Sequence, residues 1–438
     1  MYLEAAKELL AWIDRSPTSF HAVAVMKEEL EKAGAIGLSE AQRWHLEPGK
    51  RYYVTRNDSS IIAFRVGREL ENYSFNIVAS HSDSPTFKLK ENAELEIRGH
   101  YTTLDTEGYG GMLCSTWFDR PLSLAGRAIV KSGDTYETKL VNIDRDLLII
   151  PNVAIHMNRE ANNGFKYNLQ TDLLPLLEAG TPTKDAICQL VSETLGVAKE
   201  DIYGLDLFLY NRMKPTILGL NNELIASGRL DDLQCGFTSM KAFIEGENEK
   251  SINVFACFDN EEVGSGTKQG AASTFLKDTL TRINRVLGKS EEDYHCALAS
   301  SFMISADNAH AVHPNHPEKT DALNCVYMNE GIVVKACASQ SYTTDAMSAA
   351  VFKGICEKAG VPVQFFANRS DARGGGTLGS IQSRTVSINS VDIGLAQLAM
   401  HSAYEMAGVK DTYYMEEALR TFYSSHLEST EKGLQVTQ

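Results

Sequence analysis

The sequence predicts an α/β protein in which helices sandwich a mostly parallel sheet, with a β-rich unit inserted into it. After about residue 220, short apolar runs alternate with stretches of helical periodicity, as in strand-then-helix units of a parallel sheet. Between about residues 88 and 210 the pattern changes to short alternating stretches broken by turn signals such as Gly110-Gly111. Period-2 patterning with frequent turns favours antiparallel strands. The length of 438 residues suggests two or three domains.

The N-terminal elements are predicted to belong to the same sheet as the C-terminal ones. Residues 3–34 carry apolar side chains at helical spacing and are predicted to be helical. Three strands are expected next, at residues 52–54, 61–64 and 76–79. The main unit is therefore predicted to be discontinuous, with residues 1–89 and 216–438 flanking an insertion of residues 90–215.

In the second half of the chain, each apolar run is followed by a helix or a polar loop. Strands are predicted at residues 252–258, 302–305, 332–338, 364–366 and 386–391. Helices are predicted at residues 270–287, 343–359 and 393–407, with a shorter one near 184–196 inside the insertion.

The composition is that of a folded protein and excludes several classes of partner. Hydrophobic residues make up 43% and charged residues 23% of the chain. The net charge of −15 argues against nucleic acid or an anionic membrane as partner. No signal peptide or membrane span is evident. Eight cysteines without a Cys-x-x-Cys pair favour reduced thiols in a cytoplasmic protein and argue against a thiolate zinc site.

The segment 258–264 places three carboxylates in four residues directly after a predicted buried strand. Asp259, Glu261 and Glu262 repel one another there, and desolvation adds to the cost. A cation would relieve both penalties, whereas the plainer interpretation is an exposed acidic turn. In an extended backbone, Glu261 and Glu262 would point to opposite sides.

Similar polar groups follow four other apolar runs, at residues 77–79, 225–227, 302–305 and 386–391. They are His81 and Asp83; Asp231 and Asp232; Asp307 with His310, His313 and His316; and Asp392, followed by a predicted helix that carries His401. Ligands in open α/β sheets bind outside the carboxyl ends of the strands. We therefore expect these five strand ends to converge on one rim of the sheet.

Imidazole and carboxylate without thiolate suit zinc, manganese or cobalt at a hydrolytic centre. Two histidines and three carboxylates can hold two metals with one carboxylate bridging, and a further glutamate can take a proton from water. Plainer roles stay open for single residues. Asp392 is better explained as a helix N-cap, His401 as a helix-surface histidine, His310, His313 and His316 as loop residues, and Asp231 and Asp232 as capping or ion-pairing residues.

Six motifs together resemble one known family. They lie at residues 80–85, 229–232, 259–265, 305–315, 392–394 and 397–402. In this order they closely resemble the motifs of the aspartyl aminopeptidase family of co-catalytic dizinc exopeptidases. The resemblance spans nearly the whole chain and implies a zinc exopeptidase-like fold with two divalent metal ions, most simply zinc, with manganese or cobalt possible.

The resemblance also implies roles for individual residues. His81 and Asp307 would hold one metal, Glu262 and His401 the other, and Asp231 would bridge them. Glu261 would be the general base. Asp83 would orient His81, and the peptide bond after Asp231 would be cis.

Further expectations from the resemblance concern assembly and substrate. The β-rich insertion would be a dimerisation domain, with dimers assembling into a tetrahedral dodecamer, and His156 would reach the partner's active site unless it is an ordinary turn residue. Lys335 and Tyr342 would lie near the substrate, with a solvated strand end as the alternative for Lys335. Gly375 and Gly376 would flank the scissile carbonyl. Arg373 departs from the animal members, which carry Thr-Pro-Cys over the positions 372–374.

The expected function is the removal of N-terminal residues, preferentially Asp or Glu, from peptides. Three alternatives remain at this stage: the same chemistry with neutral, leucine-type specificity, a dizinc hydrolase of N-acyl amino acids, and a non-catalytic self-assembling shell.

Overall fold

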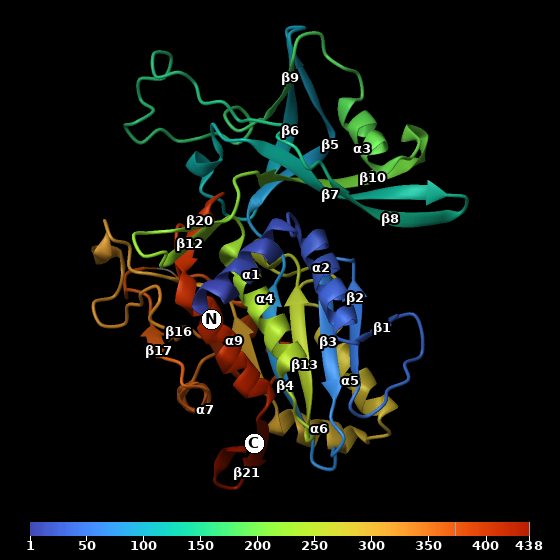
Figure 1. Ribbon diagram of the computed structural model, residues 1–438, viewed down its shortest axis with the longest axis vertical. Helices are drawn as coiled ribbons and strands as arrows, with labels where there is room; N and C mark the ends of the chain where they lie inside the picture. The colour runs from blue at the N-terminus through green and yellow to red at the C-terminus, as the bar shows by residue number, and fades with distance from the viewer. Residues whose placement is uncertain (373, 438) are drawn as a thin grey trace.

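The protein consists of two units stacked along its long axis (Figure 1). The computed structural model describes residues 1–372 and 374–437. The larger unit carries both labelled termini and a nine-stranded sheet. The smaller unit, drawn teal to green, is built from the chain between Thr86 and Asn211. Arg373, where the chain departs from the animal members, lies outside the described residues.

The nine-stranded sheet has the order β1-β2-β3-β13-β4-β14-β18-β16-β17. Its strands are β1 (Ile36–Leu38), β2 (Arg51–Arg56), β3 (Ser60–Val66), β4 (Ser74–His81), β13 (Ser251–Phe258), β14 (Phe302–Ala306), β16 (Ile332–Lys335), β17 (Val363–Phe366) and β18 (Asn389–Gly394). The pairs β1–β2, β13–β4, β4–β14, β14–β18 and β16–β17 are parallel. The pairs β2–β3, β3–β13 and β16–β18 are antiparallel. The prediction of a mostly parallel sheet is confirmed.

Helices cover both faces of this sheet because side chains alternate between the faces along each strand. In β4, Val78 belongs to the core on one face, whereas Ile77 and Ala79 belong to the core on the other. The first face is covered by α1 (Tyr2–Asp14), α2 (Ser19–Lys32), α4 (Leu230–Glu245), α7 (Ala346–Ala359) and α9 (Val409–Tyr423). The second is covered by α5 (Phe275–Val286), α6 (Glu291–Ser300) and α8 (Leu378–Gln382). In the described part of the chain, none of the helices is long and apolar enough to cross a membrane.

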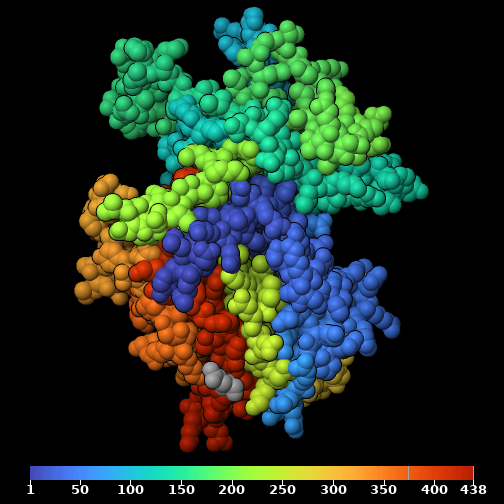
Figure 2. All heavy atoms as spheres, viewed as in Figure 1, coloured from blue at the N-terminus to red at the C-terminus, as the bar shows by residue number. Residues whose placement is uncertain are grey.

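The smaller unit is a six-stranded sheet of order β8-β7-β10-β5-β6-β9, and its pairings are antiparallel. Its strands are β5 (Thr86–Ile97), β6 (Tyr101–Tyr109), β7 (Leu122–Ser132), β8 (Thr135–Asn142), β9 (Leu176–Ala179) and β10 (Ile202–Asn211). Helix α3 (Ala186–Leu195) packs on it through Ile187 and Val191, and the turns η1 (Cys114–Trp117) and η2 (Lys199–Asp201) complete the unit. Figure 2 shows this unit at one end of the molecule, with the segment between β8 and β9 projecting from it.

A third sheet has the order β11-β12-β20-β19-β15. Its strands are β11 (Thr216–Leu218), β12 (Leu224–Ser227), β15 (Ala309–His310), β19 (Ala396–Leu398) and β20 (Glu405–Gly408). The strand end that precedes Asp231 therefore belongs to this sheet, whereas the other predicted strand ends belong to the nine-stranded one. A short hairpin of β21 (His426–Thr430) and β22 (Gly433–Thr437) follows α9.

Two helix predictions require correction. Residues 3–34 form two helices instead of one, because α1 ends before Pro17 and α2 begins after it. The helix predicted at 393–407 is wrong. This stretch contains the end of β18, then β19 and β20. Between β19 and β20, Ala399 and His401 have positive φ angles (54° and 67°), which a right-handed α-helix does not allow.

Asp392 is not a helix N-cap, so that interpretation is also wrong. It lies inside β18, and its carboxylate accepts hydrogen bonds from the backbone N–H and hydroxyl of Thr343 and from the hydroxyl of Thr377. These bonds tie the starts of α7 and α8 to the edge of the sheet.

Candidate metal centre

His81 is the last residue of β4, and its imidazole is 1% exposed. Its Nδ1 lies 3.1 Å from the carbonyl oxygen of Asp83 and 3.4 Å from Asp83 Oδ1. Its Nε2 faces the neighbouring carboxylate, 3.6 Å from Asp231 Oδ1. Because Asp83 occupies Nδ1, Nε2 is the nitrogen that is left to ligate a cation.

Asp231 lies between the two predicted metal-ligating histidines. It stands in the first turn of α4, and the Asp231–Asp232 peptide bond is cis, as expected. One carboxylate oxygen faces His81, and the other, Oδ2, lies 3.4 Å from Nε2 of His401. One carboxylate therefore faces both imidazoles, which is the arrangement that a bridging ligand requires.

His401 is positioned by both units of the protein. Its backbone N–H donates to Glu405 Oε1 at 2.7 Å, and its Nδ1 lies 3.0 Å from the carbonyl oxygen of Gly111 in the smaller unit. Its Nε2 is 3.4 Å from Glu262 Oε1. Glu405 also accepts the backbone N–H of Asp231 at 3.1 Å, so one carboxylate holds the backbone of two candidate ligands.

The acidic segment after β13 forms a short 3-10 helix, η3 (Glu261–Val263), so the extended backbone expected there is wrong. The turn arises because the Asp83 carboxylate accepts the backbone N–H groups of Glu261 and Glu262 at 3.1 and 3.2 Å. The hydroxyl of Tyr109 donates to the same carboxylate at 2.7 Å. Both glutamates have a carboxylate oxygen within 4.8 Å of a His81 ring nitrogen, so they do not point to opposite sides.

Lys335 and Tyr342 lie behind Asp307. Lys335 is 2% exposed, so its alternative as a solvated strand end is wrong. Its Nζ donates to the carbonyl oxygen of Asp307 at 2.7 Å and that of Asn308 at 3.3 Å, and lies 3.7 Å from Asp307 Oδ2. The ring of Tyr342 lies 5.3 Å from the ammonium. This cation therefore orients Asp307.

The candidate ligands form overlapping groups whose donor atoms lie within 4.8 Å of one another. One group contains His81, Asp231, Asp232 and Asp307, another contains Asp231, Glu262 and His401, and a third contains His81, Glu261 and Glu262. Asp232 was expected to cap a helix or pair with a cation. Instead its Oδ2 accepts the backbone N–H of His81 at 3.1 Å, and its Oδ1 is buried without a hydrogen-bond partner among the described residues.

The donor atoms fit a divalent cation. Within the described residues, Asp231 Oδ1, Asp232 Oδ1 and Glu262 Oε1 are buried without a hydrogen-bond partner. Buried carboxylate oxygens without partners are costly. Nitrogen and oxygen donors without thiolate are a set that zinc accepts at catalytic sites. Two of the groups share Asp231.

The electrostatics of the cluster also favour a cation. Burial raises the pKa of Glu261 to about 7, and the carboxylates of Asp307, Asp83 and Asp231 add to this in spite of His81. Burial raises the pKa of Asp307 to about 6, although Lys335 opposes it. Burial disfavours a charge on His401, yet Asp231 and Glu262 raise its pKa to about 10. A divalent cation would relieve this crowding of carboxylates.

Several predicted residues lie outside these ligand groups. His310 ends β15, His316 pairs with Glu318, and the His313 ring lies 5.4 Å from that of His316. Gly375 lines a cavity of about 360 Å³ together with His310 and Met400, the residue before His401. Gly376 is exposed, and neither glycine has positive φ.

His156 is exposed on the segment between β8 and β9, away from secondary structure. Sequence reasoning missed four groups that support the ligands: Glu405, Tyr109, Gly111 and Asp232. Asp232 was noticed in the sequence as part of the Asp231-Asp232 pair, but its support of His81 was not predicted. The other three carried no signal, because their roles depend on contacts between segments far apart in the chain.

The family model that describes aminopeptidase I zinc metalloproteases (M18) matches residues 12–423. The chain belongs to this family. It is 47% identical over 428 residues to the probable M18 family aminopeptidase 2 of Clostridium novyi (strain NT), covering 96% of this chain and 99% of that protein. The family resemblance stated from the motifs is confirmed, and the chain is a zinc metallo-aminopeptidase, a hydrolase acting on peptides.

Two solved structures show how closely the M18 fold is shared. A chain in the Ape4 and Nbr1 complex is 35% identical, with a TM-score of 0.93, covering 97% of this chain and 86% of that chain. The S. cerevisiae mApe1 dodecamer is 27% identical, with a TM-score of 0.85, covering 96% of this chain and 97% of that chain. The zinc exopeptidase-like fold expected from the motifs is confirmed.

Proposed function

We propose that this M18 aminopeptidase removes N-terminal residues, preferentially Asp or Glu, from peptides by means of a dinuclear metal centre. The observation that carries the proposal is the position of Asp231, whose two oxygens face His81 and His401 at 3.6 and 3.4 Å. A single carboxylate shared by two ligand groups supports two ions instead of one.

In this proposal His81 and Asp307 would hold one ion, Glu262 and His401 would hold the other, and Asp231 would be shared by both. When bound, two zinc ions polarise the scissile carbonyl and lower the pKa of the attacking water. Manganese and cobalt accept the same donors. Asp83 fixes the ring of His81, and Lys335 and Glu405 fix the backbones of Asp307, Asp231 and His401.

Glu261 is the proposed general base. Its carboxylate is close to His81 but has no place in the two groups that share Asp231. Burial and neighbouring carboxylates raise its pKa to about 7, which suits a group that accepts and returns a proton near neutral pH. Glu261 takes the proton of the attacking water and delivers it to the leaving amine.

The preference for an acidic N-terminal residue rests on the motifs and on the cations near the ligands. Lys335, Tyr342, Gly375 and Gly376 are the proposed substrate-binding residues. Lys335 is buried beside Asp307, and a buried positive charge acts more strongly on a nearby carboxylate than an exposed one does.

Replacing Lys335 by methionine is expected to lower kcat/KM for Asp-peptides at least about tenfold more than for Leu-peptides, because only the former carry the paired charge. The measurement is kcat/KM on an Asp and a Leu aminoacyl substrate. Equal losses on both would assign Lys335 to the support of Asp307 alone and end its role in selectivity.

We also propose that the smaller unit is a dimerisation domain, that dimers assemble into a dodecamer, and that the enzyme is cytoplasmic. The mApe1 relative is a dodecamer. The segment between β8 and β9 exposes apolar side chains that a partner would cover: Val153, Ile155, Met157, Phe165 and Leu169. His156 lies in the same segment and is proposed to contact substrate in the partner subunit.

A His156→Ala variant is expected to lose about tenfold in kcat/KM, the value of one strong hydrogen bond, while the oligomer stays intact. Kinetics and size-exclusion chromatography with light scattering measure the two quantities. The control is His295→Ala, an exposed histidine on α6. Matching rates for the two variants would show that His156 is an ordinary turn residue.

A panel of aminoacyl chromogenic substrates, assayed with zinc, manganese and cobalt, tests the proposed function as a whole. Turnover is expected to be highest for Asp and Glu substrates. Highest turnover on Leu would replace acidic by neutral specificity. Turnover of N-acetyl substrates alone would identify an N-acyl-amino-acid hydrolase, and no turnover with no bound metal would leave a non-catalytic shell.

A further inference from the structure

A cavity of about 410 Å³ lies between the two units, and Asp83 and Glu405 stand in its wall. We call it the inter-unit cavity. Its walls come from the start of α2, from β5, β7 and β10 of the smaller unit, and from the turn before α4. Its volume is within the range of small-molecule sites. Asp83 and Glu405 in its wall support the candidate ligands, whereas Arg229, Lys88 and Arg127 have no part in the proposed reaction.

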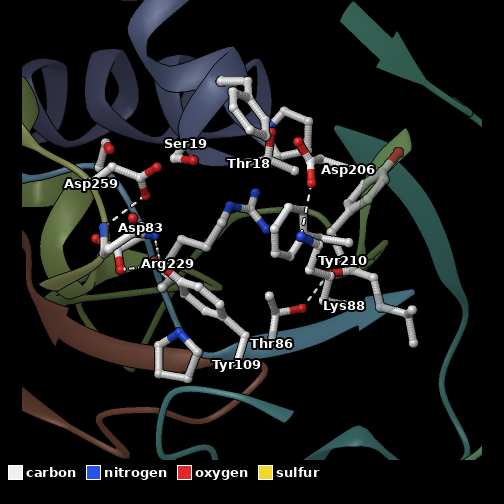
Figure 3. Close-up of a pocket in the computed structure, with 18 of the residues that line it drawn as sticks. Thr18, Ser19, Asp83, Thr86, Lys88, Tyr109, Asp206, Tyr210, Arg229 and Asp259 are labelled. Carbon is white, nitrogen blue, oxygen red and sulfur yellow. Dashed lines mark hydrogen bonds and ion pairs between the residues drawn. The ribbon is translucent and has the colours of Figure 1, made fainter. Parts of the chain in front are cut away.

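Arg229 extends across this cavity, as Figure 3 shows. Among the residues that the structure describes, it forms no ion pair within 4.0 Å, and its only hydrogen bond runs from one terminal nitrogen to the carbonyl oxygen of Ile13 at 3.3 Å. Its Nε is buried without a partner. A guanidinium offers five N–H donors, so most of those of Arg229 are unused. A cation held in this way is costly unless an anion joins it.

Lys88 and Arg127 add further positive charge to the same side of the cavity. Both pair with Asp206: Lys88 Nζ lies 2.8 Å from Oδ1 and Arg127 Nε 2.9 Å from Oδ2. The Asp206 carboxylate is therefore engaged by these two cations, and among the described residues no ion pair joins it to Arg229. The other acidic groups in the wall are already engaged. Asp83 accepts three hydrogen bonds, Glu405 accepts two, and Asp259 accepts the backbone N–H of Asn260.

The remaining walls are aromatic, and the cavity is open to solvent. Phe20, Tyr109, Trp117 and Phe208 line it, and the exposed residues Thr267 and Lys268 stand at its edge. Aromatic walls with a few convergent donors are typical of sites for small organic ligands. The unused N–H donors of Arg229 select an anion, and the planar guanidinium matches a carboxylate in particular.

We propose that the inter-unit cavity is a binding site for a small organic carboxylate, whose charged group pairs with Arg229 and whose apolar body packs against the aromatic wall that Phe20 and Phe208 help to form. The site is separate from the metal ligands, and the proposal does not depend on the reaction proposed above. Free amino acids and other organic acids share this chemistry.

The test combines crystallography with calorimetry on the metal-loaded full-length protein. Crystals soaked in 4-bromobenzoate are expected to show an anomalous bromine peak inside the inter-unit cavity. In solution, 4-bromobenzoate is expected to bind at least about tenfold more tightly than the neutral 4-bromobenzamide, since charge-assisted hydrogen bonds are lost with the amide. Bromine found only at the metal ligands, or binding at crystal concentration only, would overturn the proposal.

Variants assign the binding to the arginine. Arg229→Met is expected to weaken 4-bromobenzoate binding at least about tenfold, whereas Arg43→Met, at an exposed position outside the cavity, should leave it unchanged. Unchanged binding by folded Arg229→Met would overturn the proposal. If Arg229→Met does not fold, the affinities of the unchanged protein for 4-bromobenzoate and 4-bromobenzamide still test the proposal. Equal affinities for the two compounds would overturn it.

Discussion

Replacing Glu261 by glutamine is expected to lower kcat by about 10²- to 10⁴-fold while metal content and fold are kept. This is the usual contribution of a positioned general base. Glutamine has the same shape and preserves the backbone N–H bond of residue 261 to Asp83, but it cannot accept the proton of the attacking water. Steady-state kinetics on an Asp aminoacyl substrate measures kcat, and elemental analysis measures metal content.

The neighbouring glutamate provides the matched control. Glu262→Gln changes the same side chain one position along η3, but Glu262 is a proposed ligand whose Oε1 lies 3.4 Å from His401 Nε2. This variant is expected to lose metal as well as activity, whereas Glu261→Gln keeps its metal. A Glu261→Gln variant with near-normal kcat would remove Glu261 as the base.

Replacing Asp231 by asparagine is expected to abolish metal binding at both positions and, with it, activity. The Asp231 carboxylate faces both imidazoles, so losing its charge weakens two coordination sites at once. Partners outside the ligand shell alone are worth about 10- to 100-fold in metal affinity, so the loss of a bridging ligand should exceed about 100-fold. Elemental analysis after dialysis and competition with a chelator measure occupancy and affinity.

A histidine of the same rim provides the control for this variant. His313 follows β15 and is exposed, outside every ligand group of the described residues. His313→Ala is expected to retain full metal occupancy and activity. An Asp231→Asn protein that still holds two ions would contradict the bridging role.

The sheet could be predicted from the sequence because its strands are short, fully apolar and followed by polar rims. Val254 to Phe258 and Ile77 to Ala79 are buried on both faces, and such strands read as continuous apolar runs. The helix prediction for residues 393–407 failed because the sequence pattern there was misleading. Its apolar residues recur at helical spacing, but pairing of β18 with β14 and of β19 with β20 outweighs that periodicity.

The grouping of the proposed ligands followed from the strand-end rule, since His81 ends one strand of the nine-stranded sheet and Glu262 and Asp307 follow two others. What holds them in place could not be predicted. Gly111 and Tyr109 belong to the smaller unit, and Glu405 begins a strand of the third sheet. Such contacts join segments up to 290 residues apart, and spacing along the chain carries no trace of them.

The most direct test of the dinuclear centre is a metal titration of chelator-treated protein, followed by turnover of an Asp aminoacyl substrate. We predict no activity before zinc is added and a rise that breaks at two equivalents of zinc per chain. A break at one equivalent, or full activity in the metal-free protein, would contradict the assignment of Asp231 as a bridge between two catalytic ions.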